Sequence, residues 1–329
     1  STKIDLLWLS VMIALTILIG FRFYVGGDWG NYYWQVERAT GTPFSEAFAL
    51  RGDPLFALLN WLSGNLGFGV YGVQIISGLV FSFGLIKLCL TLPRPFLGLT
   101  VAIPYLVFVT ALGYSRQGLS IGICMYALTL LLKEKKLYFL ILILIAASVH
   151  KSAIILLPML GMYSKQNKIT TFLWLVGSSV IAFFVFIYSY IEFLVFAYIE
   201  AEYNSRGALI RLLMGSICGL IFLIFTKKFK MQESEKKIWI FYSYAALILF
   251  FALFVSPGST ALDRIGLYFI PLQLVVLSYL PELFDVKKKI SQLLKFLIVS
   301  YCTMILMVWL FFSDSAFRWL PYKSFLVEQ

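Results

Sequence analysis

The sequence predicts an all-α, polytopic integral membrane protein. Of its 329 residues, 61% are hydrophobic and only 13% are charged. The mean hydropathy of +0.89 lies far above that of soluble domains, in which roughly a quarter of residues are charged. Long apolar runs recur along the whole chain, so residues 1–329 are expected to form a single transmembrane domain.

Apolar runs near the roughly 20 residues needed to cross a hydrocarbon core of about 30 Å define the expected spans. They are Leu6–Phe21, Val70–Leu90, Phe96–Leu112, Gln117–Leu132, Ile169–Ser189, Ala208–Phe225, Ile238–Val255, Ile265–Phe284 and Leu293–Phe312. The first lacks a small-residue cleavage pattern and is expected to be a retained anchor. Shorter runs of about 12 residues would reach only ~20 Å as helices. These are Leu55–Leu66, Leu137–Val149 and Ser152–Tyr163.

Lysine clusters orient these runs, because positively charged loops stay in the cytoplasm. The clusters lie at 133–136, 165–168, 227–237 and 287–289. Lys136 and Lys165 must then both face the cytoplasm, so the chain between them is expected to form a hairpin. Its tip, "SVHKS", would be sunk below the outer surface or reached through a thinned bilayer.

The same rule fixes the number of crossings. Only one net crossing fits between Asp28 and Lys87, so Leu55–Leu66 is expected to be a re-entrant or interfacial helix. With Lys3 inside, about eleven transmembrane helices result. Residues 22–54, 190–207, 256–264 and the tail 313–329 then form the extracytoplasmic loops, where we expect the site.

Arginines follow the opposite distribution from lysines. Of the nine arginines, only Arg94 falls on the cytoplasmic side of this topology. An outer arginine suits bidentate binding of phosphate or carboxylate. The alternative is that each arginine pairs with a neighbouring acid such as Asp53 or Asp263.

Polar residues at the outer start of one expected span form the first group of candidate site residues. The segment "GYSRQG" places Tyr114, Arg116 and Gln117 where free backbone N–H groups and the helix dipole favour an anion. Ionisable groups at membrane depth are functional candidates by default. A snorkelling surface residue or a satisfied structural pair is the alternative.

Two further segments supply candidates on the same face. "SVHKS" contains His150, the single histidine, beside Lys151. "STALDRIGLY" contains Asp263 and Arg264, with Tyr268 one turn further into the helix.

The segment "GGDWGNYY" follows the first apolar run and supplies Asp28, Asn31, Tyr32 and Tyr33. Its glycines fit a tight backbone, and its acid and aromatic groups suit a sugar. An interfacial turn capped by Asp28 is the alternative.

Several classes of function are excluded or disfavoured. A single histidine and the lack of a paired acidic motif argue against a metal site, so no metal and no cofactor are expected. The four cysteines lie in apolar runs without CxxC spacing. The net charge of +11 is mostly cytoplasmic lysine, which suits membrane lipids and gives no argument for nucleic acid.

The order of motifs resembles the EpsG family of polysaccharide polymerases, which are Wzy-like. The motifs are "RFYVGGDWGNYYWQVE", "RGDPLFALLNWL", "YSRQGLSIGICMYALTLLLKEKKLYFLILILIAASVHKSAIILLP", "DRIGLYFIPL" and "WLPY". Asp53-Pro54 stands where Glu-Pro is typical, and the charge is kept. The resemblance implies a GT-C-like enzyme of the bacterial inner membrane, active on the periplasmic or outer side. Its substrates would be undecaprenyl-pyrophosphate-linked oligosaccharides, with a chain-length regulator protein as a further partner.

The implied reaction is glycosyl transfer, in which a sugar hydroxyl attacks the anomeric carbon and undecaprenyl pyrophosphate leaves. Arg116 and Arg264 are expected to stabilise the leaving group. His150 is expected to act as general base, with Asp28 as the other candidate. The expected substrate-binding residues are Asn31, Tyr32, Tyr33, Arg51, Asp53, Tyr114, Gln117, Lys151, Arg211, Asp263 and Tyr268. A lipid-linked oligosaccharide flippase or transporter and an O-antigen ligase-type transferase remain alternatives, although no internal repeat typical of transporters is visible.

Overall fold

Helices make up the regular structure of the described chain. The computed structural model describes residues 4–49, 53–163, 173, 176–177, 180, 205, 207–283 and 288–327. Within these residues the only β pairing is an isolated antiparallel bridge between Arg22 and Ser324. The helices are α1 Leu6–Gly20, α2 Trp29–Ala39, α3 Phe44–Ala49, α4 Pro54–Asn65, α5 Gly69–Cys89, α6 Pro95–Ala102, η1 Ile103–Ala111, α7 Ser115–Leu131, α8 Lys136–Val149, η2 Lys151–Leu156, α9 Met159–Tyr163, α12 Ala208–Phe225, η5 Thr226–Lys228, α13 Glu233–Ala252, α14 Thr260–Gly266, η6 Leu267–Phe269, α15 Pro271–Tyr279, η7 Leu280–Glu282, α16 Lys288–Phe312 and η8 Ala316–Arg318. The expected all-α class is confirmed for this part of the chain.

Several helices have the length and apolarity to cross a membrane. Among the described residues they are Gly69–Cys89, Ala208–Lys228 and Lys288–Phe312. A bent pair, Thr260–Phe269 with Pro271–Glu282, passes the same test together. Shorter apolar helices are Leu6–Gly20, Pro95–Ala111, Lys136–Val149 and Lys151–Gly161. The expected span Ile169–Ser189 falls almost wholly outside the described residues.

Prolines explain where the helices depart from the expected runs. The run Ile265–Phe284 bends by 45° at Pro271, which lacks a backbone N–H and clashes with the preceding turn. Ser152–Tyr163 forms the 3₁₀ helix η2 and the short α9, with Pro158 between them. In Phe96–Leu112, the second half is π-helical from Ile103 and contains Pro104.

Much of the segment 22–54, which is expected on the outer side, is helical. Two helices, α2 and α3, precede α4, which matches the expected short helix Leu55–Leu66. One face of α2 buries Trp29, Tyr32 and Val36, and this spacing is typical of an amphipathic helix. Because polar residues lie between these positions, the segment contains no continuous apolar run that would predict a helix.

Close backbone contact holds the centre of the bundle together. A Cβ atom on Gly84 of α5 would lie 1.9 Å from the carbonyl oxygen of Gly122 on α7. On the other side of α5, a Cβ on Gly78 would lie 3.1 Å from Cβ of Ile19 in α1. Small residues at such crossings let membrane helices approach closely, which increases dispersion contacts.

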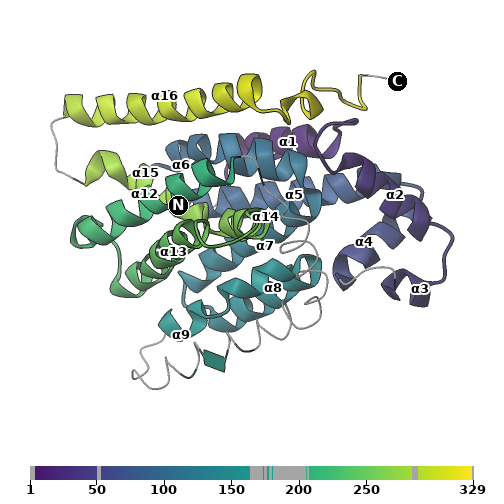
Figure 1. Cartoon of the computed structure of the whole chain (residues 1–329), viewed down its shortest axis with the longest axis horizontal. Helices are drawn as coiled ribbons and strands as arrows, with labels where there is room; N and C mark the ends of the chain where they lie inside the picture. The colour runs from purple at the N-terminus through teal and green to yellow at the C-terminus, as the bar shows by residue number, and fades with distance from the viewer. Residues whose placement is uncertain are drawn as a thin grey trace.

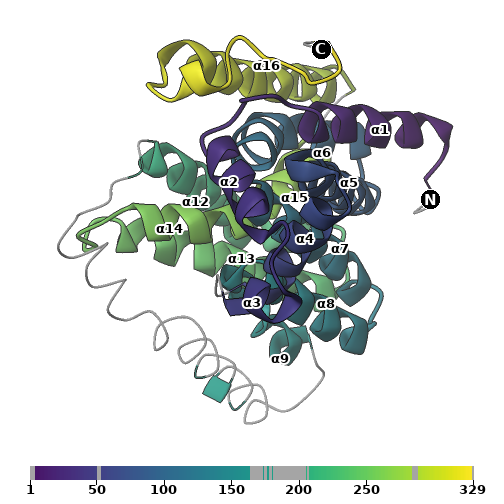
Figure 2. The same ribbon diagram turned by 90° about the vertical axis from the view of Figure 1, so that its right-hand side faces the viewer.

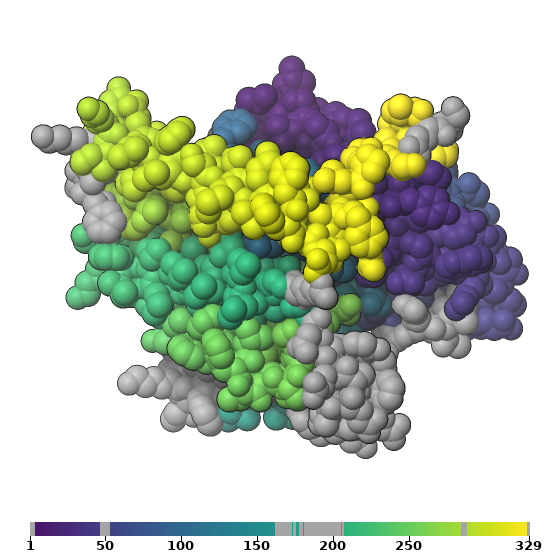
Figure 3. Space-filling model, turned by 45° about the horizontal axis from the view of Figure 1, so that its top comes forward, coloured from purple at the N-terminus to yellow at the C-terminus, as the bar shows by residue number. Residues whose placement is uncertain are grey.

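Helix α16 lies on the outside of the bundle. Figure 1 shows it running along one edge of the molecule, and Figure 3 shows it as a ridge over the layer that contains α12. Only 11% of its most apolar window is buried. An apolar helix with that exposure suits contact with lipid.

The C-terminal tail folds back onto the segment after α1. The backbone N–H of Gly26 donates to the carbonyl of Arg318 at 2.8 Å, and that of Phe23 donates to the carbonyl of Lys323 at 3.0 Å. Trp319 donates from Nε1 to the carbonyl of Phe108 at 2.8 Å. Figure 2 shows α2 to α4 and the chain's end on the face toward the viewer. The tail therefore helps to build the end of the bundle that carries the site candidates.

Candidate active site

The start of α7 joins three expected site residues. The Arg116 guanidinium forms an ion pair with Asp53 at 2.6 Å, and both side chains are largely buried. The backbone N–H of Arg116 donates to the hydroxyl of Tyr32 at 3.4 Å. The Tyr32 hydroxyl therefore meets an N–H of the first turn of α7, one of the donors without a partner inside the helix.

A hydrogen bond connects this helix start to α14. The Gln117 side-chain amide donates to the backbone carbonyl of Arg264 at 2.6 Å. Residues 147 positions apart in sequence thus meet. This contact fixes Arg264 relative to α7, while its own guanidinium makes no hydrogen bond or ion pair with any described residue.

His150 lies at the end of α8 in a chain of side-chain hydrogen bonds. Its Nδ1 is 3.1 Å from the hydroxyl of Tyr268, which donates to Oγ of Ser120 at 3.0 Å. Ser120 donates in turn to the carbonyl of Ala146 at 2.9 Å. A carbonyl can only accept, so the single protons of Ser120 and Tyr268 are both committed. Nδ1 of His150 must then carry the proton, which leaves Nε2 as the unprotonated nitrogen.

The surroundings of His150 keep its imidazole neutral. Burial, followed by the positive charges of Arg116 and Arg264, lowers its pKa to about 3. The residue lies just beyond the last residue of α8. At neutral pH it is therefore a hydrogen-bonding group with a free lone pair on Nε2.

Arg211 and Asp263 form a buried pair between α12 and α14. Nε of Arg211 donates to Asp263 at 2.6 Å, and Nη2 contacts the other carboxylate oxygen. Ser205 completes the group, since its hydroxyl donates to Asp263 at 2.6 Å and accepts from Arg211 at 3.0 Å. Both carboxylate oxygens are engaged, whereas Nη1 of Arg211 takes no part in these bonds.

A polar cavity of about 330 Å³ opens beside this pair. Its lining residues are Val109, Tyr114, Ser205, Arg211, Thr260, Asp263, Arg264, Leu267, Trp309, Ser313, Ser315 and Trp319. The rings of Trp309 and Trp319 meet edge to face with centroids 4.9 Å apart. The cavity thus combines a guanidinium that no described residue pairs, from Arg264, with aromatic walls.

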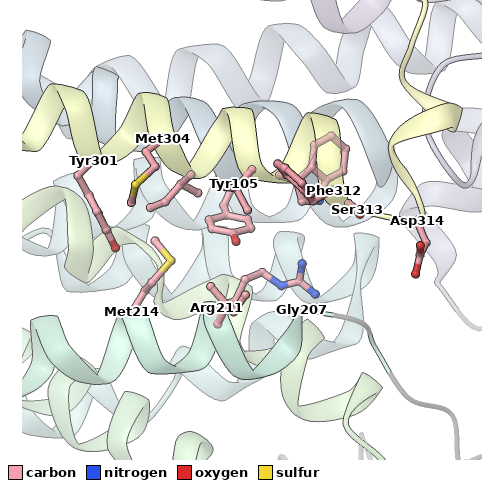
Figure 4. Close-up of a pocket in the computed structure, with 13 residues that line it drawn as sticks. Tyr105, Gly207, Arg211, Met214, Tyr301, Met304, Phe312, Ser313 and Asp314 are labelled. Carbon is pink, nitrogen blue, oxygen red and sulfur yellow. The ribbon is translucent and has the colours of Figure 1, made fainter.

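An apolar cavity of about 520 Å³ adjoins the polar one and shares Arg211, Trp309 and Ser313 with it. Figure 4 shows it between α12 and α16, with Met214 and Arg211 on one side and Tyr301, Met304 and Phe312 on the other. The guanidinium carbon of Arg211 lies 5.7 Å from the ring centroid of Tyr105. Arg211 thus places a cation where the apolar and polar cavities meet.

The segment "GGDWGNYY" lies at the same end of the molecule but outside the polar cavity's lining. Gly26 has a φ of +98°, and a Cβ there would lie 2.2 Å from the carbonyl oxygen of Leu112. Asp28 precedes α2 without capping it through its side chain and accepts from Asn31 at 3.5 Å. Tyr33 stacks on Trp29 with ring centroids 5.8 Å apart.

Two expected site residues add little to this geometry. Lys151 begins η2 next to His150. Arg51 lies outside the described residues.

Arg22 is an outer arginine without an expected role. It is fully buried and donates to the carbonyl of Ala111 at 2.9 Å and to the hydroxyl of Ser115 at 2.5 Å. It serves the packing of α1 against the start of α7.

The structure adds residues that the sequence did not single out. Ser120 and Ser205 complete the two polar networks, and Trp309 and Trp319 line the polar cavity. Two of them had a usable signal, because Trp319 belongs to the "WLPY" motif and Ser120 to the motif that begins "YSRQGLS". Within the described residues, no group of three or more His, Cys, Asp or Glu side chains is arranged to hold a metal ion.

Comparison with known proteins gives a family match. The model of the EpsG family matches residues 5–324. No curated protein and no solved structure shows significant similarity to the chain.

Proposed function

The chain belongs to the EpsG family of polysaccharide polymerases, and on that premise we propose that it joins lipid-pyrophosphate-linked oligosaccharide repeat units by metal-independent glycosyl transfer. The carrier proposed is undecaprenyl pyrophosphate. The hydroxyl at the non-reducing end of one repeat attacks the anomeric carbon of the other chain. The bond from that carbon to pyrophosphate breaks, and the lipid pyrophosphate leaves.

The pair of adjoining cavities is the observation that supports this proposal most. An amphipathic substrate with a long apolar tail, a pyrophosphate and a sugar needs an apolar groove that opens into a polar chamber. The cavity between α12 and α16 supplies the groove, and its neighbour supplies Arg264 and two tryptophans. Aromatic faces pack against the apolar faces of sugar rings. Arg211 stands at the junction, where the pyrophosphate would lie.

Fixed cations would stabilise the negative charge that develops on the leaving group. We assign this role first to Arg264, because it lines the polar cavity and its guanidinium has no partner among the described residues. Arg211 assists through Nη1 while Asp263 holds its other nitrogens in place. Arg116 is held by Asp53, and its positive charge acts on the region around His150.

His150 is assigned as the general base that accepts the proton of the attacking hydroxyl at Nε2. A base with a pKa near 3 is weak, and Arg116 and Arg264 contribute to that low pKa. A bound pyrophosphate would offset these positive charges and raise the pKa toward the working range. The substrate would thereby activate its own base. A single displacement of this kind inverts the anomeric centre.

The proposed orientation places the cavities outside the cytoplasm. Along α16, Lys288 and Phe312 are separated by about 36 Å, at 1.5 Å per residue. The lysine end belongs inside by the positive-inside rule, so the end at Phe312, with both cavities, faces outward. We propose about eleven spans in a GT-C-like arrangement in the inner membrane. Cysteines introduced at Asn31 and Lys133 should react with an impermeant maleimide from outside and inside respectively, and the reverse pattern would refute this orientation.

Reconstitution tests the activity directly. Purified protein in liposomes is mixed with a lipid-pyrophosphate-linked repeat unit and no nucleotide sugar. A ladder of products that increase by one repeat is expected. Relocation of the substrate without lengthening would instead identify a transporter, and transfer onto a different lipid would identify a ligase.

A further inference from the structure

A third cavity lies at the opposite end of the bundle from the proposed active site. It measures about 490 Å³ and is lined by Arg94, Lys230, Pro281, Glu282, Lys288, Ser291, Gln292 and Lys295. Lys288 and Lys295 lie at the start of α16, whereas the apolar and polar cavities lie near its end. The two regions share no lining residue.

The lining carries an excess of positive charge. Among its described lining residues, four cations face one carboxylate, that of Glu282. They come from separate parts of the chain: Arg94 precedes α6, Lys230 follows η5, and Lys288 and Lys295 are two turns apart on α16. Like charges repel, so bringing cations from three segments to one cavity is costly unless an anion neutralises them.

Arg94 is the fixed member of the group. Its Nη2 lies 3.1 Å from Glu282 and 3.5 Å from the hydroxyl of Ser291. Its Nε is buried and has no hydrogen-bond partner among the described residues. Lys230, Lys288 and Lys295 form no ion pair with any described carboxylate. Among the described residues, three lysine charges and the Nε–H and Nη1 N–H groups of Arg94 are therefore left without a partner after the Glu282 pair is formed.

We propose that this cavity binds the phosphates of an acidic phospholipid head group in the cytoplasmic leaflet. Basic pockets between membrane helices on the cytoplasmic side bind multivalent lipid head groups. Arginine binds phosphate through a planar fork and lysines bind it as point charges. The exposed apolar face of α16 next to the cavity, with Leu293 and Phe296, offers a surface for the acyl chains. A lipid with two phosphates, such as diphosphatidylglycerol, matches the number of cations best.

Binding to a phospholipid and binding to soluble phosphate are distinguished by titration. Purified protein in neutral detergent is titrated with diphosphatidylglycerol, with phosphatidylcholine, and with inorganic phosphate and pyrophosphate, and bound lipid is counted by native mass spectrometry. Saturable binding of diphosphatidylglycerol is expected, without binding of phosphatidylcholine. Pyrophosphate should compete only weakly. Saturation by pyrophosphate with no preference for the phospholipid would overturn the assignment to a lipid.

Matched variants locate the binding. The double variant Lys288→Gln, Lys295→Gln should weaken lipid binding by at least about tenfold, the effect of 1.4 kcal/mol. The control, Lys237→Gln with Lys289→Gln, removes the same charge from exposed positions that do not line the cavity and should change binding less than twofold. Equal losses in both would overturn the proposal. The readout needs no glycan substrate, so it is independent of the proposed polymerase activity.

Discussion

Nδ1 of His150 lies 3.1 Å from the hydroxyl of Tyr268, a residue 118 positions further along the chain. Through Ser120 this contact ties the end of α8 to α7 and to the segment after α14. The network has one consistent set of proton positions, in which Nε2 of His150 is left free. The fold therefore fixes the tautomer of the residue that we assign as base, before any substrate binds.

Tyr268→Phe should lower kcat by about tenfold, because the variant lets the imidazole rotate and exchange its tautomer. His150→Ala should lower kcat by ~10²- to 10⁴-fold, which is the usual contribution of a general base. Both are measured as initial rates of product lengthening in liposomes.

Tyr242→Phe is the matched control for Tyr268→Phe. Tyr242 is also fully buried, but its hydroxyl has no hydrogen-bond partner among the described residues. Its loss should leave kcat unchanged. Normal kcat in Tyr268→Phe, or equal losses in both variants, would remove the hydrogen-bonded chain from the mechanism.

The low pKa of His150 leads to a prediction about pH. In the free enzyme this pKa is about 3, so kcat/KM, which reports free-enzyme groups, should show no step from this residue near pH 6.5. In the unfolded chain the imidazole titrates near 6.5. Between these two values the unfolded state binds a proton that the folded state does not, so stability should fall as the pH drops through 6.5.

Thermal melting in detergent at pH 7 and at pH 5 checks this linkage. The melting temperature of the parent protein should drop more than that of His150→Gln, which lacks the titrating group. An equal drop in both proteins would show that His150 is not held neutral by its surroundings.

Arg264→Gln should reduce kcat by ~10²- to 10³-fold, as expected for removal of one fixed donor that stabilises developing charge. Arg38→Gln removes the same charge from an exposed position on α2 and should leave kcat unchanged. Rates are measured with the lipid-linked repeat unit at saturation. If Arg264→Gln retained full activity, the leaving group would have to be stabilised elsewhere.

Asp263→Asn should destabilise the protein by ~3–5 kcal/mol, because it leaves the Arg211 charge buried without its partner. The side chains of Arg211 and Asp263 are 10% and 9% exposed. Glu37→Gln, on the exposed side of α2, is the control for the loss of one carboxylate. The measurement is chemical unfolding in detergent micelles. Equal stability of the two variants would show that the Arg211 charge is well solvated.

Apolar runs were enough to locate most helices but not their breaks. The runs predict α5, α12 and the apolar part of α16 within a few residues, because a continuous apolar stretch leaves few alternatives in a membrane. The helix α2 was missed, since only one of its faces is apolar. The bend at Pro271 could have been expected from the proline alone.

The candidate site was predictable as a set of residues and not as a set of contacts. Arg116 and Asp53, or Arg211 and Asp263, could each be named, but an arginine fork fits any carboxylate, so only the fold decides the pairs. Serines such as Ser205 carry no signal of their own in a sequence. The polar cavity depends on α14 and α16 meeting, which is a property of packing.

Gly84→Ala should destabilise the bundle by ~1–3 kcal/mol, the usual cost of overpacking. The added Cβ would meet the backbone oxygen of Gly122 at 1.9 Å, and a backbone atom cannot rotate away as a side chain can. Helices α5 and α7 would have to separate. Gly30→Ala is the control, since nothing lies within 4 Å of its Cβ position in α2, and it should stabilise by up to ~1 kcal/mol because alanine favours the helix. Thermal melting of both variants in one detergent measures the difference. If Gly84→Ala melted at or above the temperature of Gly30→Ala, the contact between α5 and α7 would not require a glycine.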